Sequence, residues 1–218
     1  MSSEAILVKE TGLPDMTAEA NKQPSKPWFM PVMLSTFLLV GYGIASAIYS
    51  YGSSDVYDKR IATITTYDLK WLYLSAFIWT FLVIFLNFYP MQFKSKVMLT
   101  NSGNLRSNMF IYKLAAEGSS ESAVVLNNEG DIGMYNRGNR SLYHFVENSQ
   151  PVLIGLILNS FVFPYPTFIV ICVYALGRVL YAIGYTNKGY GGHVIGFVLD
   201  RICLNVLLGQ FLLIFIKA

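Results

Sequence analysis

Five apolar stretches divide the chain, and polar segments of different lengths separate them. A helix that crosses the hydrocarbon core of a bilayer, which is about 30 Å thick, needs about 20 mostly apolar residues. Each stretch is long enough, so the pattern predicts an all-α integral membrane protein. The five predicted transmembrane helices cover about residues 28–51, 71–93, 142–163, 167–185 and 194–216.

The polar segments predict which parts lie outside the bilayer. Residues 1–27 have no apolar region after a basic start, which argues against a cleavable signal peptide and indicates a disordered tail. The loop 94–139 is the only sizeable extramembrane piece, and 109–112 and 124–126 within it are expected to form short strands or a packed cap. Ten lysines and arginines on the side of the tail and this loop, against four opposite, predict that both are cytosolic.

The composition agrees with a membrane protein, since 54% of the residues are hydrophobic and 13% are charged. A net charge of +3 is too small and too dispersed to indicate nucleic-acid binding. No glycine-rich phosphate loop, paired CxxC or HExxH pattern occurs, and no metal site is predicted. The two histidines alone are weak grounds for a haem. Cys172 and Cys203 lie in apolar runs and are expected to be small buried hydrophobes.

Ionisable side chains stand at the start of the third apolar stretch. Arg140, His144, Glu147 and Pro151 are spaced four, three and four residues apart, so they share one helix face, with Asn148 beside Glu147. Charged groups at the edge of a membrane span are costly unless they pair or face a watery cavity. These residues are therefore a candidate site.

The fourth stretch carries a second polar stripe at the same spacing, made by Tyr174, Arg178, Tyr181 and Tyr185. A guanidinium and tyrosine hydroxyls on one intramembrane face could hold a carboxylate-bearing ligand. The structural alternative is an ion pair between Arg178 and Glu147 that joins two helices. The residues alone leave both open.

The fifth stretch contains Asp200 and Arg201, which point about 100° apart because they are adjacent on a helix. We expect them to form separate interhelical contacts or to snorkel toward the interface. A role for Arg201 as a displaced catalytic cation is the functional alternative.

Taken together, Arg140-x3-His144-x2-Glu147-Asn148-x2-Pro151 and Gly177-Arg-Val-Leu-Tyr-Ala-Ile-Gly-Tyr185 resemble the MAPEG family, the membrane-associated proteins of eicosanoid and glutathione metabolism. The second segment looks most like the branch of microsomal glutathione transferase three and leukotriene C4 synthase. The resemblance covers residues 71–218, which implies a MAPEG-like four-helix transmembrane bundle. The helix at 28–51 is then one additional N-terminal transmembrane helix, and the loop 94–139 also goes beyond the family's usual pattern.

The resemblance implies a homotrimer that binds glutathione, as cosubstrate, between subunits near the cytosolic side. It implies a membrane-bound glutathione-dependent transferase or peroxidase that acts on lipophilic electrophiles or lipid peroxides from the lipid bilayer. The endoplasmic reticulum is the expected location, since no transit peptide is evident. The glutathione-binding roles fall by position on Arg140, His144, Glu147, Asn148, Arg178, Tyr181 and Tyr185.

The chain departs from the family's pattern in two places. His144 stands where the family has asparagine, although a histidine can still make one hydrogen bond. The thiolate-stabilising arginine is expected seven or eight residues after the second tyrosine, where this chain has Gly192 and His193. Lys188 and His193 are therefore the candidate catalytic cations. The alternative function is a non-catalytic scaffold or accessory subunit of a membrane complex; a transporter or channel is disfavoured because no internal repeat is visible.

Overall fold

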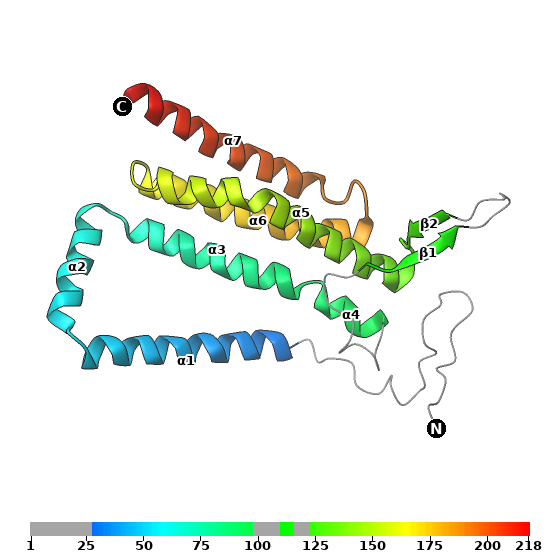
Figure 1. Ribbon diagram of the computed structural model, residues 1–218, viewed down its shortest axis with the longest axis horizontal. Helices are drawn as coiled ribbons and strands as arrows, with labels where there is room; N and C mark the ends of the chain where they lie inside the picture. The colour runs from blue at the N-terminus through cyan, green and yellow to red at the C-terminus, as the bar shows by residue number, and fades with distance from the viewer. Residues whose placement is uncertain (1–27, 98–109, 116–122) are drawn as a thin grey trace.

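A computed structural model describes residues 28–97, 110–115 and 123–218 (Figure 1). The predicted tail 1–27 lies outside the described residues, as does part of the predicted loop 94–139. The described part contains seven helices and one two-stranded sheet. They are α1 (Phe29–Tyr51), α2 (Ser54–Thr66), α3 (Lys70–Phe88), α4 (Met91–Val97), β1 (Tyr112–Ala115), β2 (Ala123–Leu126), α5 (Gly130–Asn159), α6 (Pro164–Lys188) and α7 (Val194–Lys217).

Helices α3, α5, α6 and α7 form one bundle in which α6 packs against the other three (Figure 1). Its core is aromatic at the centre, where the Trp79 ring lies 5.8 Å from that of Phe145 and 5.9 Å from that of Tyr174. Leu156 and Leu207 are buried in the same cluster. The predicted all-α membrane architecture is therefore confirmed, with α6 as its central helix.

Four described helices are long and apolar enough to cross a membrane. They span Pro31–Tyr51, Lys70–Lys94, Pro164–Lys188 and Val194–Lys217, in agreement with four of the five predicted stretches. Helix α5 is not among them, because polar side chains in its middle turns, including those of the candidate site, lower its hydropathy.

Several predicted boundaries were wrong. Helix α5 begins at Gly130, so residues 130–139 are helical and not part of a loop. Helix α2 was not predicted at all. Residues 164–166, which separate the third and fourth predicted stretches, form the first turn of α6, where a proline is tolerated because the first amides of a helix have no intrahelical partner.

Two short strands form a hairpin that is tied to α5. β2 covers the predicted strand at 124–126, whereas β1 overlaps the predicted 109–112 only at Tyr112. β1 and β2 pair antiparallel, with Tyr112 opposite Leu126. The buried amide of Asn136 on α5 donates to the carbonyls of Ile111 and Asn127, at 2.7 Å each, and accepts from the Ile111 amide at 2.9 Å. These three hydrogen bonds explain how a polar stretch can continue a helix and hold a cap at one end of the bundle.

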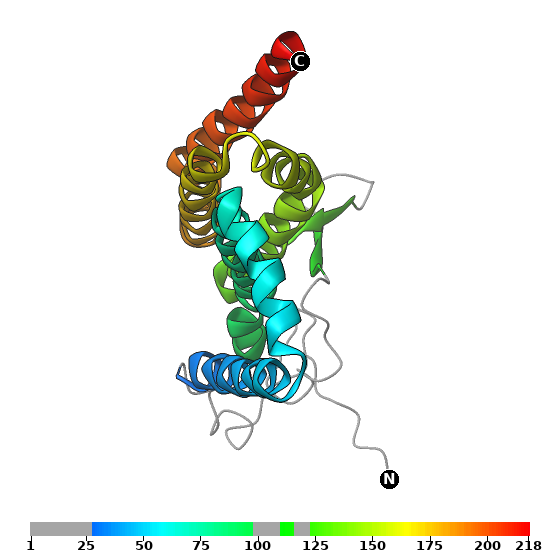
Figure 2. The ribbon, with the colours of Figure 1, turned by 90° about the vertical axis from the view of Figure 1, so that its left-hand side faces the viewer.

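Helix α1 lies apart from the site helices. In both ribbon views α3 stands between α1 and the group α5–α7, and α2 connects α1 to α3 (Figures 1 and 2). The apolar side chains of α1 are largely exposed, as lipid contact requires. A side-chain carbon added at Gly41 or Gly43 would meet no described atom within 4 Å, so neither glycine lies at a close contact with another described helix.

Candidate functional site

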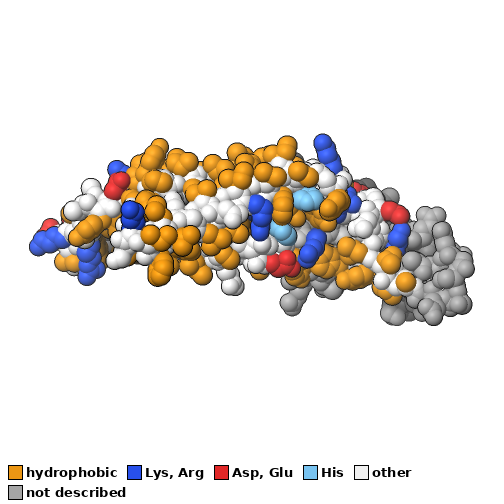
Figure 3. Space-filling model, turned by 90° about the horizontal axis from the view of Figure 1, so that it is seen from above, with side chains coloured by type: hydrophobic (Ala, Val, Ile, Leu, Met, Phe, Trp, Pro, Cys, Tyr) orange, Lys and Arg blue, Asp and Glu red, His pale blue; other side chains and the backbone are white. Residues whose placement is uncertain are grey.

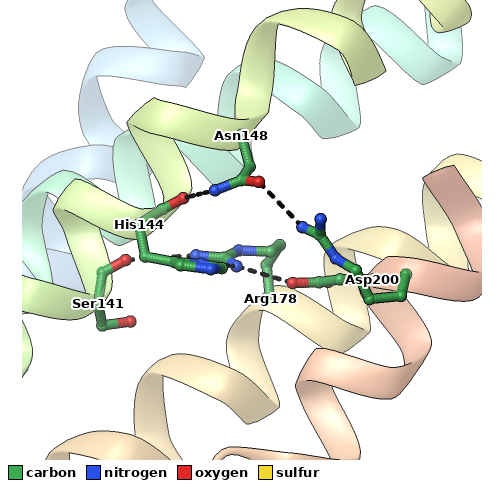
Figure 4. Close-up of polar contacts among 6 residues, drawn as sticks. Ser141, His144, Asn148, Arg178 and Asp200 are labelled. Atoms are coloured by element: carbon green, nitrogen blue, oxygen red, sulfur yellow. Dashed lines mark hydrogen bonds and ion pairs between the residues drawn. The ribbon is translucent and has the colours of Figure 1, made fainter.

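Polar side chains from α5, α6 and α7 meet inside the bundle (Figure 4). His144 and Asn148 come from α5, Arg178 comes from α6, and Asp200 and Arg201 come from α7. The helices can approach closely because glycines line the contact between α6 and α7. A side-chain carbon on Gly196 would lie 2.4 Å from the Gly177 carbonyl oxygen and from the Tyr181 amide nitrogen. No larger residue fits there without moving one helix.

Arg178 is the centre of this polar group and is completely buried. It donates from one terminal nitrogen to Asp200 Oδ2 at 2.7 Å and to His144 Nδ1 at 3.0 Å, and from the other to the Ser141 carbonyl at 3.3 Å. The structural alternative, an ion pair between Arg178 and Glu147, is therefore corrected, because Arg178 pairs with Asp200 and Glu147 pairs with Arg140. Arg178 faces the interior between α5 and α7, whereas half of the Glu147 side chain is exposed on the outer side of α5.

His144 is held between this arginine and a tyrosine. Its ring is stacked on that of Tyr181, with centroids 4.8 Å apart and planes 8° from parallel. A guanidinium has no acceptor atom, so His144 Nδ1 must accept the hydrogen bond from Arg178. A neutral His144 therefore carries its proton on Nε2. His144 thus offers one N–H donor.

His193 lies in an aromatic cluster at the start of α7. Its ring centroid is 5.0 Å from that of Tyr181 and 5.3 Å from that of Tyr185. The turn that brings it there uses Gly189 and Gly191 at φ 70° and 93°, a region in which other residues are strained. The second candidate cation, Lys188, is exposed in the last turn of α6. The structure therefore brings His193, but not the Lys188 side chain, onto the tyrosine stripe.

Arg140 and Glu147 form an ion pair along the outer face of α5, at 3.3 Å. The two residues are two helical turns apart, which agrees with the predicted shared face. Their side chains are 49% and 51% exposed, so both charged groups remain accessible from outside this chain. Figure 3 shows one face of the molecule on which histidine, basic and acidic side chains gather within a largely apolar surface.

Arg201 makes a separate contact with α5. It donates to Asn148 Oδ1 at 3.1 Å, and its guanidinium lies 5.3 Å from the centroid of the Phe197 ring. The Asn148 amide nitrogen in turn donates to the His144 carbonyl at 2.8 Å. Adjacent Asp200 and Arg201 therefore contact different helices, α6 and α5, as their angular separation predicted.

Sequence reasoning missed the aromatic partners of the arginines. The centroid of the Phe145 ring lies 5.4 Å from the Arg178 guanidinium, and Phe197 plays the same part for Arg201. The signal was present, because Phe145 follows His144 directly and Phe197 is one turn after His193. Among the described residues no group of three or more histidine, cysteine or acidic side chains could hold a metal ion.

One protein-family model matches the part of the chain that contains these residues. The model of the MAPEG family matches residues 71–213, which include almost all of α3 and most of α7. All the site residues described above lie inside this range, whereas α1 and α2 precede it. No curated protein and no solved structure matches the chain.

Proposed function

The chain belongs to the MAPEG family, and we therefore propose that it is a membrane-bound enzyme that uses glutathione as cosubstrate. Its reaction is a transfer to lipophilic electrophiles or a reduction of lipid peroxides, both of which reach the site from the bilayer. The observation that carries this proposal is the hydrogen bond between Arg178 and His144, which joins the motif on α5 to the motif on α6. Tyr181 lies against both residues.

The chemistry of the available side chains fits glutathione. The tripeptide carries two carboxylates, one ammonium group and a thiol. Arg140 and Glu147 are half-exposed and of opposite charge, so they suit a carboxylate and the ammonium group respectively. Asn148 and the hydroxyl of Tyr185 add neutral hydrogen-bonding groups. In this proposal Arg140 and Glu147 exchange their weak mutual contact for contacts with the ligand.

Arg178 has a different part in the proposal, because it is buried and already has three hydrogen-bond partners. It acts as a positioning residue that fixes the ring of His144 and supports that of Tyr181. His144 then presents its Nε2–H as a donor for an acceptor on the ligand. The homotrimer and the endoplasmic reticulum location belong to the same proposal, with a neighbouring subunit completing the site on the outer face of α5.

The test is calorimetry of glutathione binding to the detergent-solubilised protein. We expect binding by the unmodified chain and its loss in an Arg140→Ala, Glu147→Ala double variant. The matched control is Lys113→Ala, Glu129→Ala, which also removes one exposed ion pair but lies in the cap. Loss of binding in both variants, or no binding by the unmodified protein at millimolar glutathione, contradicts the proposal. Turnover is then assayed with a lipid hydroperoxide.

A second candidate function is a non-catalytic scaffold. It is favoured by the segment between α6 and α7, where Gly192 and His193 stand in place of the expected arginine. Helices α1 and α2, which precede the family match, would supply contact surface for a partner. This function predicts co-purification with stoichiometric partners. A homogeneous homotrimer with robust thiol transfer rules it out.

A further inference from the structure

An aromatic residue that precedes β1 lies against the outer face of α5. The ring of Phe110 is stacked on that of Tyr143, with centroids 5.3 Å apart and planes 27° from parallel, and both side chains are half-buried. The next residue fixes this position, because the N–H and the carbonyl of Ile111 are both hydrogen-bonded to the buried amide of Asn136, at 2.9 and 2.7 Å. Asn136 precedes Tyr143 by two helical turns, so the two residues share one face of α5.

The ion pair on the outer face of α5 runs between two aromatic rings. At about 100° per residue, Arg140 and Glu147 lie about 20° apart around the helix axis. By the same geometry Tyr143 lies about 40–60° to one side of them and His144 about 40–60° to the other. Each ring is backed by an aromatic ring from another segment, which is α6 for His144 and the segment before β1 for Tyr143. A ligand that lies along the two charges therefore has an aromatic wall on each side.

Core packing does not explain the second wall. Neither Phe110 nor Tyr143 belongs to the two buried hydrophobic clusters of the described residues. The stack nevertheless limits the rotation of the Tyr143 ring, because one face of that ring is covered by Phe110. A ring that is already oriented when a ligand arrives reduces the conformational entropy that binding costs.

We propose that Tyr143 contacts glutathione, with its ring packed against the amide groups of the tripeptide, and that Phe110 positions this ring. The inference rests on the proposed function, because it adds a wall to the same site. Amide groups are planar, and a flat ring with two side-chain torsions covers them at a low cost in entropy. The hairpin beside the first turns of α5 is then part of the binding site (Figure 1).

The test measures glutathione binding and turnover in variants of the full chain. Phe110→Leu keeps an apolar side chain but removes the ring that backs Tyr143. We expect the Kd and the KM for glutathione to rise about tenfold, while kcat stays within about twofold. Phe110→Tyr restores a ring and should bind as the unmodified protein does. The matched control is Tyr112→Leu, since Tyr112 is an exposed aromatic residue two positions further along the same segment.

Two variants of Tyr143 separate its ring from its hydroxyl. Tyr143→Phe keeps the stacked ring and should bind glutathione within about twofold of the unmodified protein, whereas Tyr143→Leu should weaken binding about tenfold. In the Tyr143→Leu background, Phe110→Leu should cause no further loss, because its effect passes through the tyrosine ring. Tyr143→Leu carries the test if Phe110→Leu does not fold.

Three results would overturn the inference. The first is unchanged glutathione affinity in Phe110→Leu or in Tyr143→Leu. The second is an equal loss of affinity in Tyr112→Leu, which would mean that any change in this segment disturbs the protein. The third is a further tenfold loss from Phe110→Leu in the Tyr143→Leu background, which would mean that Phe110 does not act through Tyr143.

Failure of this inference is distinguishable from failure of the proposed function. If the unmodified protein binds glutathione and the Arg140→Ala, Glu147→Ala variant does not, normal binding by both leucine variants overturns only the second wall. No binding by the unmodified protein overturns the proposed function and the inference together.

Discussion

Removal of Asp200 should expose how strongly the buried ion pair holds the bundle together. Asp200 and Arg178 are both 0% exposed, and their side chains meet at 2.7 Å between α7 and α6. Breaking a buried pair by removal of one partner leaves the other charge uncompensated, which costs about 3–5 kcal/mol. We therefore expect Asp200→Ala to lower the free energy of unfolding by about this amount.

The remaining contacts of Arg178 set the effect of a milder change. Asp200→Asn keeps an acceptor oxygen for the guanidinium, and a hydrogen bond to a charged group contributes about 1.5–3 kcal/mol. The loss in Asp200→Asn should then be about 2 kcal/mol. The double variant Arg178→Met, Asp200→Leu removes both charges and leaves apolar side chains in the core, so it should be less destabilised than Asp200→Ala.

The assay is reversible unfolding by sodium dodecyl sulfate in mixed micelles, followed by circular dichroism. A double-mutant cycle of Asp200→Ala and Arg178→Met should give a coupling free energy of at least about 2 kcal/mol. Glu129→Ala is the control, because it breaks an exposed pair that contributes about 0–1 kcal/mol. A loss below about 1 kcal/mol in Asp200→Ala, or additive effects in the cycle, would refute the reasoning.

Three further predictions follow from the packing around the site. Gly196→Ala should destabilise the bundle by about 3 kcal/mol, because the added carbon would meet the backbone of Gly177 and Tyr181. Gly209→Ala is the control, since its added carbon would meet no described atom within 4 Å. The thermal unfolding midpoint of Gly209→Ala should be no lower than that of the unmodified protein. Arg137→Ala loses hydrogen bonds to the Thr186 and Asn128 carbonyls, so hydrogen exchange should accelerate over 186–193; unchanged protection there would contradict this role. Nitrogen-15 NMR should find His144 protonated on Nε2 alone at neutral pH, and a signal from a protonated Nδ1 would disprove the hydrogen bond from Arg178.

The sequence predicted which residues share a helix face better than it predicted which residues of other helices they contact. Spacing alone placed Arg140 and Glu147 on one face, and they form an ion pair. The same reasoning could not choose between Glu147 and Asp200 as the partner of Arg178, because periodicity gives direction around one helix and not the rotation of a neighbouring helix. Only the three-dimensional packing shows that Asp200 faces α6.

Hydropathy also failed to predict a helix in a segment whose polar groups are buried with their hydrogen-bond partners. Residues 130–139 were predicted as part of a loop because they are polar, yet Asn136 is completely buried and its amide satisfies three backbone groups of the cap. A buried polar side chain with all its partners costs little, but its partners are distant in the sequence. Such a segment is recognised as helix only when the strands it binds are known.

The two arginines on the interhelical faces bear on the choice between an enzyme and a scaffold. Arg178 shows how this chain treats a charge that serves packing, since an acid neutralises it and a histidine and a carbonyl accept further hydrogen bonds from it. Arg201 is only half-buried, and its hydrogen-bond partner is neutral. Among the described residues no carboxylate pairs with Arg201, and a cation in a membrane span is costly unless it pairs or faces a watery cavity. The difference between the two arginines therefore favours a site that receives an anion.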